Sequence, residues 1–411
     1  MTKKNVFIFG AGLYGLILAV LLNKKKYNVT IVDQSDEILS GFRPIRISKY
    51  LLNNGFHGID YPRSKKLISF LDQRIKFKLN KFAVQKKIII EKFIVDYLDR
   101  FEEFPKKLKQ IYKEKNLKFY KNQNYNFFFS RSFKKNLLIN AKRYSSEAKV
   151  SEGFFLPYFL PSDTKHISKD EGDTFRNKIR NNKIKSFCYL PKNGIFFSLK
   201  NKFSKVLKKQ KIKILKNSKI IIDKNLYIKI INKNSEISLP KETKIFFCMS
   251  SVFFLKYKGH NLLRKLSKNK RDFYNVLIKI KKEDEKNTLT EALVLNKKIF
   301  YVNRITKNHF IKDSKFNFYQ IELLINKITN TEKIKKDLQS ELSKILKCKI
   351  HFVGLKLSRI TFHPSKNWFI NAKSIVKKII KKLPYNISIR YSFYPVNMNK
   401  AWIWANEDVK D

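Results

Sequence analysis

The chain has 411 residues, of which 43% are hydrophobic and 14% aromatic, so it can bury a core and is neither a small disulfide scaffold nor a disordered chain. Its formal net charge of +56 comes mainly from lysines scattered along the whole length, whereas a nucleic-acid surface gathers its basic residues in one stripe. We therefore expect no specific nucleic-acid partner; a basic face that attracts an anionic substrate or contacts an acidic membrane surface remains an alternative.

The first predicted element is the uncharged run VFIFGAGLYGLILAVLL at residues 6–22. Its length is at the short limit for a membrane-spanning helix, and the lysines before it could begin a signal peptide, but no small-residue cleavage site follows. Three glycines, Gly10, Gly12 and Gly15, have the G-x-G-x-x-G spacing. We therefore expect a buried strand, a glycine turn and the start of a helix, with no transmembrane segment.

A second strand, YNVTIVD, closes a β-α-β unit on Asp33, 18 residues after Gly15. An acidic residue at about this distance binds the ribose hydroxyls of a dinucleotide and disfavours the 2′-phosphate of NADP. Gly10 permits the tight turn, Gly12 lets the backbone approach a pyrophosphate, and Gly15 lets the helix pack close to the strand. The helix N-terminus offers free N–H groups to the phosphates. The sequence therefore predicts a Rossmann-like, dinucleotide-binding domain.

Residues 6–42 resemble the opening of the FAD-binding amine oxidase superfamily, which includes protoporphyrinogen oxidases, phytoene desaturases and UDP-galactopyranose mutases. The resemblance implies FAD as the cofactor. In the family a Gly-Gly pair meets the flavin pyrophosphate after the second strand; here Ser40-Gly41 stands in that place, with a spacing one residue longer. The cofactor contacts implied in this part of the chain are Gly10, Ala11, Gly12, Tyr14, Gly15, Asp33, Gln34, Ser40 and Gly41.

Two further stretches are similar to the same family and follow in the expected order. Residues 189–220 contain a Pro-x-x-Gly turn, apolar residues at helical spacing and an alternating strand. The resemblance implies that Ile220 offers backbone contacts to the adenine. The stretch KETKIFFCMSS resembles the returning strand of the FAD domain and implies a contact at Ser250.

Residues 53–71, NNGFHGIDYPRSKKLISFL, resemble a Gly-x-His segment of the UDP-galactopyranose mutases. The resemblance places His57 beside the flavin ring as a candidate catalytic residue, since an imidazole can change protonation near neutral pH. The alternative is a histidine that only packs in a loop. Arg63 is a second catalytic candidate, because a guanidinium suits a diphosphate or carboxylate; a surface ion pair is its alternative.

The end of the chain, SIRYSFYPVNMNKAWIWANE, resembles the mutase C-terminus, where an Arg-Tyr strand leads to a Met-bearing helix near the flavin. The resemblance implies a catalytic role for Arg390 and cofactor contacts at Tyr391 and Met398. The Gly-Asp clasp that is usual in amine oxidases is missing. We therefore expect either a short last helix or an incomplete grip on the flavin.

The remaining sequence predicts an α/β fold, α+β overall, in which one domain is interrupted by insertions. Residues 1–65, 188–256 and 386–411 are expected to form the FAD-binding domain. Residues 66–187 are expected to form a helical and aromatic cap. Residues 257–385 are expected to form a substrate domain with an antiparallel sheet, because their apolar residues alternate.

Three cysteines without CxxC spacing indicate a reducing, cytoplasmic setting, and six scattered histidines predict no metal site. We expect an FAD-dependent oxidoreductase, similar to amine oxidases and protoporphyrinogen oxidases, that acts on an unidentified small molecule at the flavin face. Two alternatives remain. One is a UDP-galactopyranose mutase-like isomerase that acts on a sugar nucleotide, and the other is a non-catalytic binding protein with a degenerate FAD fold.

Overall fold

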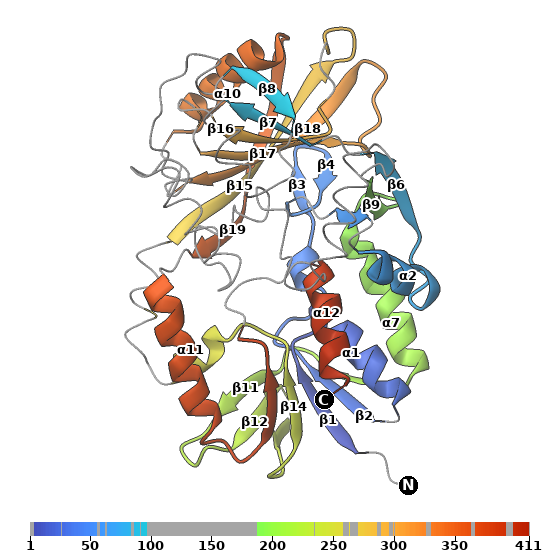
Figure 1. Cartoon of the computed structure of the whole chain (residues 1–411), viewed down its shortest axis with the longest axis vertical. Helices are drawn as coiled ribbons and strands as arrows, with labels where there is room; N and C mark the ends of the chain where they lie inside the picture. Colours follow the sequence, from blue (N-terminus) through green and yellow to red (C-terminus); the bar gives the residue numbers. More distant parts are fainter. Residues whose placement is uncertain are drawn as a thin grey trace.

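The structure is a computed structural model of the chain (Figure 1), and the statements below concern the residues whose placement it describes. These are residues 4–25, 27–55, 58–61, 64–83, 86–90, 92–96, 187–233, 235–257, 263, 270–285, 289–295, 299, 301–325, 330–362, 366–391 and 398–410. Within these ranges no helix has both the length and the apolar character needed to cross a membrane.

A parallel sheet of five strands forms the core of the lower half of the molecule in Figure 1. Every neighbouring pair in it is parallel. In spatial order the strands are β10 (Lys213–Leu215), β2 (Asn28–Val32), β1 (Asn5–Phe9), β14 (Lys244–Phe247) and β20 (Asn386–Ile389). Strands from three distant parts of the chain thus lie side by side, and the predicted Rossmann-like fold class is confirmed.

Both faces of this sheet are buried, which explains why its strands are apolar runs rather than alternating ones. In β1, for example, Ile8 packs with one apolar cluster and Phe9 with the other. The first face is covered by the helices α1 (Leu13–Lys24), α7 (Leu199–Lys209) and α12 (Met398–Asp408). The second face is covered by the small sheet β11 (Lys219–Ile222), β12 (Ile228–Asn232) and β13 (Ser235–Ser238), and by α8 (Val252–Tyr257) and α11 (Lys366–Ile380).

Helix α1 is apolar on all sides because it is covered on nearly all sides. Leu13 to Val20 and Leu22 are buried, and they share one cluster with residues of β1, α7 and α12. Figure 1 shows α12 lying alongside α1. The uncharged run at residues 6–22 is therefore strand β1, the glycine turn and most of helix α1, as predicted.

A second sheet of seven strands lies above the first in Figure 1. Its neighbours are antiparallel except β16 and β7, which are parallel. In order the strands are β19 (Ile350–Phe362), β15 (Lys270–Lys281), β18 (Phe316–Ile325), β17 (Val302–Asn308), β16 (Glu291–Leu295), β7 (Lys86–Ile90) and β8 (Phe93–Asp96). Helix α10 (Thr331–Leu346) packs on one face through an apolar cluster.

The region expected as a cap, residues 66–187, is divided between structures. Strands β7 and β8 extend the seven-stranded sheet, and β6 (Leu79–Ala83) pairs with β9 (Phe187–Pro191), which in turn pairs with β5 (Ile59–Tyr61). Helix α2 (Lys65–Gln73) precedes these strands. Residues 97–186, with the aromatic clusters expected over the flavin, lie outside the described residues. The hairpin β3 (Ile45–Ile47) and β4 (Tyr50–Leu52) lies against β19.

Tyr385 lies directly before β20 and joins it to the small sheet β11–β13. Removing its hydroxyl should lower the stability of the protein measurably. Its buried hydroxyl accepts a hydrogen bond from the N–H of Ile228 at 2.8 Å and donates to the carbonyl of Leu239 at 3.3 Å. Tyr385→Phe leaves both backbone groups without this partner, so we expect a loss of about 1–2 kcal/mol in the free energy of unfolding, measured in urea.

Tyr50→Phe is the matched control for this prediction. The ring of Tyr50 packs against Phe318, with centres 4.9 Å apart, and its hydroxyl makes no hydrogen bond within the part of the chain that the structure describes. We expect this variant to change the free energy of unfolding by less than about 0.5 kcal/mol. Equal losses in the two variants would contradict the assignment of the Tyr385 hydrogen bonds.

Candidate functional site

Two glycines bring three elements together at the turn between β1 and α1. Gly10 has a φ of +111°, and a Cβ there would lie 3.1 Å from backbone atoms of Cys248 and Met249, just after β14. Residues other than glycine rarely adopt a backbone conformation with such a φ. A Cβ at Gly15 would lie 2.0 Å from the carbonyl oxygen of Gly10. Both positions therefore require glycine, and the close approach of helix and strand predicted for Gly15 is present.

Gly12 differs from these two glycines because it faces open space. A Cβ added there would meet nothing within 4 Å. Gly12 is exposed and is the N-cap of α1, which has no side-chain capping bond and no acidic residue in its first turn. The first N–H groups of such a helix are unsatisfied and carry a partial positive charge. The residues present therefore fit the pyrophosphate of a dinucleotide.

Asp33, at the end of β2, lies beside this turn. One of its carboxylate oxygens accepts a hydrogen bond from the N–H of Ala11 at 2.5 Å, and the other accepts one from Ser35 at 2.8 Å. Its carbonyl accepts from the N–H of Ser218 at 3.0 Å, so β11, which carries Ile220, begins next to Asp33. Each carboxylate oxygen can accept a second hydrogen bond. The structure thus brings Ala11, Asp33 and Ile220 into one neighbourhood, where a ribose and an adenine would follow the pyrophosphate.

The Ser40-Gly41 pair borders the same turn. Residues Ser40–Phe42 form a single 3-10 turn (η1). Just before it, the N–H of Leu39 donates to the carbonyl of Ala11 at 2.9 Å, and the hydroxyls of Ser40 and Ser35 are 3.1 Å apart. A Cβ at Gly41 would meet nothing within 4 Å. The pair therefore borders the glycine turn, and nothing in the fold requires glycine at position 41; the contact of Ser40 and Gly41 with a pyrophosphate remains a prediction.

Two other predicted contacts lie on the surface near this turn. Gln34, next to Asp33, is exposed. Ser250 follows β14 and is also exposed; its hydroxyl accepts from the N–H of Val252 at 3.3 Å, at the start of α8. Both are accessible to a bound molecule, and their cofactor contacts remain predictions.

The structure gives Tyr14 and Arg390 different partners from those expected. The hydroxyl of Tyr14 donates to Asp408 of α12, and burial raises the pKa of Tyr14, which keeps the phenol protonated. Arg390 forms ion pairs with Asp408 at 2.5 Å and with Glu407 at 3.1 Å. The Tyr14 hydroxyl and the Arg390 guanidinium are therefore both bound to carboxylates of α12, and a cofactor contact of Tyr14 and a catalytic role of Arg390 remain predictions.

Tyr391 and Met398 lie on the two sides of a gap in the described residues. Tyr391 has a φ of +39°, and the ammonium groups of Lys373 and Lys377 are 5.6 and 5.9 Å from the centre of its ring. Met398 is buried at the start of α12, in the same apolar cluster as Ala11. Their contacts with a flavin remain predictions.

His57 and Arg63 lie outside the described residues, whereas residues 53–55 are described. The side-chain amide of Gln320 donates to the carbonyl of Asn53 at 3.0 Å. Gly55 has a φ of +88°, and a Cβ there would lie 3.4 Å from Glu322. Residues 53–55 therefore lie against β18 of the seven-stranded sheet.

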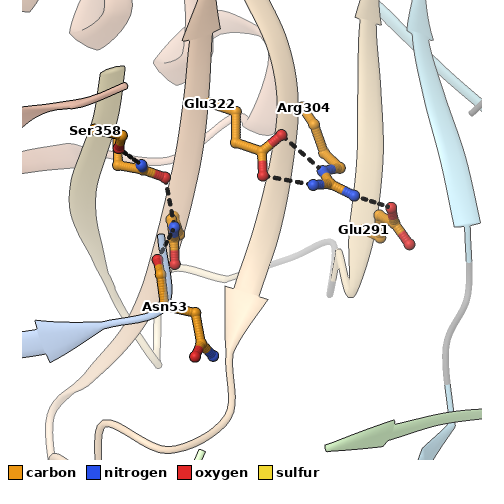
Figure 2. A network of polar contacts seen from close by, with 7 residues as sticks. Asn53, Glu291, Arg304, Glu322 and Ser358 are labelled. Atoms are coloured by element: carbon orange, nitrogen blue, oxygen red, sulfur yellow. Dashed lines mark hydrogen bonds and ion pairs between the residues drawn. The ribbon is translucent and has the colours of Figure 1, made fainter. Parts of the chain in front are cut away.

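The face of this sheet that meets residues 53–55 carries a buried ion network (Figure 2). Arg304 of β17 lies between Glu322 of β18, with N···O distances of 2.5 and 3.2 Å, and Glu291 of β16, at 3.2 Å. These three residues are 2–6% exposed. The sequence alone did not indicate this network. The available signal was the alternation of Gln320 and Glu322 with apolar residues in the strand FNFYQIELLI, which places both polar side chains on one face.

A chain of amides continues the polar face toward β19 (Figure 2). The side chain of Gln320 donates to Asn275 of β15 at 2.5 Å, and Asn275 donates to Ser358. The opposite face of the same sheet is apolar and packs on α10. A sheet whose polar face is buried needs partners for that face, and part of this requirement is met by residues 53–55.

A small cavity borders the polar face at its β16–β17 end. Its lining residues are Phe82, Cys188, Leu190, Thr290, Glu291, Thr306 and His309. Among the described residues, the buried hydroxyl oxygen of Thr306 has no hydrogen-bond partner. Burial lowers the pKa of His309, whose ring stacks on Phe82 at 4.9 Å. The cavity, of about 10 Å³, has room for about one water molecule beside the Thr306 hydroxyl.

Across the ranges that the structure describes, no group of three or more histidine, cysteine, aspartate or glutamate residues is placed to hold a metal ion.

The parallel sheet and the glycine turn define a dinucleotide-binding domain of Rossmann type, joined to a sheet with one buried polar face.

Comparisons with known proteins agree with this class. Residues 8–74 match the model of the NAD(P)-binding Rossmann-like domain family. A solved structure of reduced UDP-galactopyranose mutase is similar, with a TM-score of 0.60 and 13% identity, over 100% of this chain and 93% of that one. Putrescine oxidase bound to putrescine has a TM-score of 0.59 and 13% identity, over 100% and 99%. No curated protein matches the sequence.

A third solved structure, a fatty acid isomerase from P. acnes that produces CLA, has a TM-score of 0.58 and 12% identity, over 100% of this chain and 99% of that one. These likenesses confirm, at the level of fold, the predicted resemblance to the amine oxidase and UDP-galactopyranose mutase group. Their names cover an oxidase, a mutase and an isomerase. The shared fold by itself therefore does not select a reaction.

Proposed function

We propose that this protein is an FAD-dependent oxidoreductase that acts on a small molecule. The observation that carries the proposal is the glycine turn: Gly10 and Gly15 leave no room for a side chain, while Gly12 opens the start of α1 to an anion. The arrangement of Asp33 beside β11 supports a dinucleotide that continues from the pyrophosphate to a ribose and an adenine. When bound, FAD accepts a hydride or electrons from a substrate.

In this proposal the protein binds and orients, and the residues have simple roles. The N–H groups at the start of α1 bind the pyrophosphate, and Asp33 accepts hydrogen bonds from the ribose hydroxyls. Ala11, Ser40, Gly41 and the backbone at Ile220 border the same path. The remaining contacts proposed for the cofactor are Tyr14 through its backbone, Gln34, Ser250, Tyr391 and Met398.

The substrate is proposed to lie toward the polar face of the seven-stranded sheet. The buried Thr306 hydroxyl, which has no partner among the described residues, can hydrogen-bond a small molecule while the surrounding apolar residues exclude water. His57, Arg63 and Arg390 remain the candidate catalytic residues. We further propose a cytoplasmic setting, because the three cysteines are free thiols.

The visible spectrum of the purified protein tests the cofactor, and turnover tests the reaction. We expect the spectrum of an oxidised flavin, bleached by a reductant, and substrate turnover that requires an electron acceptor. A colourless protein that does not take up FAD on reconstitution would overturn the proposal, and it would favour the non-catalytic alternative.

The second candidate is a flavin-dependent isomerase of the UDP-galactopyranose mutase kind, which the sequence resemblance at residues 53–71 and at the chain end favours. Such an enzyme needs cationic side chains for the diphosphate of its substrate. Arg304, the arginine that the structure describes on the polar face, is already paired with Glu291 and Glu322. This observation makes the oxidoreductase the better supported proposal. Activity on UDP-galactofuranose that appears only after reduction with dithionite would reverse the order.

Gly12→Val is expected to abolish FAD retention while the fold persists. The added side chain would fill the space in front of the helix start, where the pyrophosphate must approach, yet it would meet no protein atom at the Cβ position. The measurements are flavin content after purification and thermal unfolding of the apoprotein. Gly12→Ala, with a smaller side chain, should give an intermediate loss. Normal flavin content in Gly12→Val would refute the assignment of this turn.

A further inference from the structure

Asp408, in the last turn of α12, is a buried carboxylate to which the proposed reaction assigns no role. Its side chain is 0% exposed. The hydroxyl of Tyr14 donates to one carboxylate oxygen, and a guanidinium nitrogen of Arg390 lies 2.5 Å from the other. The hydroxyl of Ser388 is 3.5 Å from that second oxygen. The carboxylate is therefore shared between three elements: α1, β20 and α12.

These elements surround the glycine turn. Tyr14 lies in the first turn of α1, two residues after Gly12, and Arg390 directly follows β20. Strand β20 pairs with β14, whose end approaches Gly10. Figure 1 shows α12 running beside α1, and the ring of Tyr14 packs edge-on against Trp404 of α12, with centres 5.7 Å apart. Asp408 thus joins the start of α1 to α12, the helix that begins with Met398.

Apolar packing alone could hold α12 against α1 without the cost of burying a charge. A buried carboxylate with specific partners instead favours one relative position of the elements that it joins. We infer that Asp408 is a positioning residue of the cofactor site, which sets the place of the start of α1 and of α12 for FAD. This inference rests on the proposed function.

Glu407 provides a matched control in the neighbouring position. It also pairs with Arg390, at 3.1 Å, but its side chain is 42% exposed and it makes no contact with Tyr14 among the described residues. Glu407→Gln and Asp408→Asn each remove one negative charge that pairs with Arg390. The two charges differ because that of Asp408 is buried and accepts a hydrogen bond from Tyr14 of α1, whereas that of Glu407 is exposed.

The experiment titrates FAD into the apo forms of the full-length wild-type protein and both variants. We expect Asp408→Asn to bind FAD about tenfold more weakly, because the buried negative charge that pairs with Arg390 and strengthens the hydrogen bond from Tyr14 is lost, and Glu407→Gln to bind within about twofold of the wild type. Flavin that remains bound to Asp408→Asn should show an altered spectrum or reduction potential, which a contribution to stability alone would not produce.

Equal affinities for Asp408→Asn and the wild type, or equal losses in the two variants, would overturn the inference while the proposed function stands. A wild-type protein that binds no FAD would overturn the proposed function and this inference with it. If Asp408→Asn does not fold, Tyr14→Phe decides, since it keeps the ring against Trp404 and removes only the donor. We expect a loss of about threefold in FAD affinity for that variant, and unchanged affinity would overturn the inference.

Discussion

Gly15→Ala is expected to destabilise the nucleotide-binding domain severely. The added Cβ would lie 2.0 Å from the carbonyl oxygen of Gly10 and 3.2 Å from a methyl group of Ile8. The first obstacle is backbone and the second is a fully buried side chain, so α1 must move away from β1. Overpacking costs about 1–3 kcal/mol and occasionally more, and a backbone collision belongs at the upper end of that range. Urea unfolding of the apoprotein measures the loss.

Gly41→Ala is the matched control for stability, because a Cβ there would meet nothing within 4 Å. We expect it to unfold at a urea concentration close to that of the wild type. Gly15→Ala should lose stability and flavin together, whereas Gly12→Val should lose flavin alone. Wild-type stability in Gly15→Ala would show that α1 does not pack on β1 as closely as described here.

Arg304→Met should have a comparable or larger effect on the second sheet. Without the guanidinium, Glu291 and Glu322 remain buried without the cation that both contact. Removing one member of a buried ion network costs about 3–5 kcal/mol, because an uncompensated charge is left in the interior. We expect this loss in the free energy of unfolding, measured in urea at neutral pH.

Two further variants isolate the cause. Adding Glu291→Gln and Glu322→Gln to Arg304→Met removes both charges and should recover most of the stability. Arg43→Met is the exposed counterpart, since Arg43 also contacts two carboxylates, Asp36 and Glu37, but on the surface. We expect Arg43→Met to unfold close to the wild type. If the triple variant were no more stable than Arg304→Met, buried charge would not explain the loss.

Local sequence patterns were sufficient to predict the structure where an element contacts only its neighbour along the chain. The glycine spacing predicted both the turn between β1 and α1 and the close approach of the helix at Gly15. Glycine has this predictive value because the conformation and the steric limits belong to the backbone itself.

Side-chain partners across long sequence separations could not be predicted in this way. Tyr14 was expected at the cofactor, but its hydroxyl contacts Asp408, 394 residues away. Residues of β7 and β8 were expected in a cap, yet both strands belong to the seven-stranded sheet, where β7 pairs in parallel with β16. Arg304 is enclosed by Glu291 and Glu322, which belong to two other strands, and no local pattern indicated these pairs.

The sequence by itself determined the strand, glycine turn and helix at the start of the chain, the acidic residue that closes the unit, and the class of fold. These follow from backbone sterics and from apolar periodicity, which act over a few residues. Only the tertiary structure decided that α12 is tied to α1 through Asp408, and that the second sheet presents a buried polar face around Arg304. The physical reason is that desolvation and charge pairing depend on which distant elements exclude water from each other.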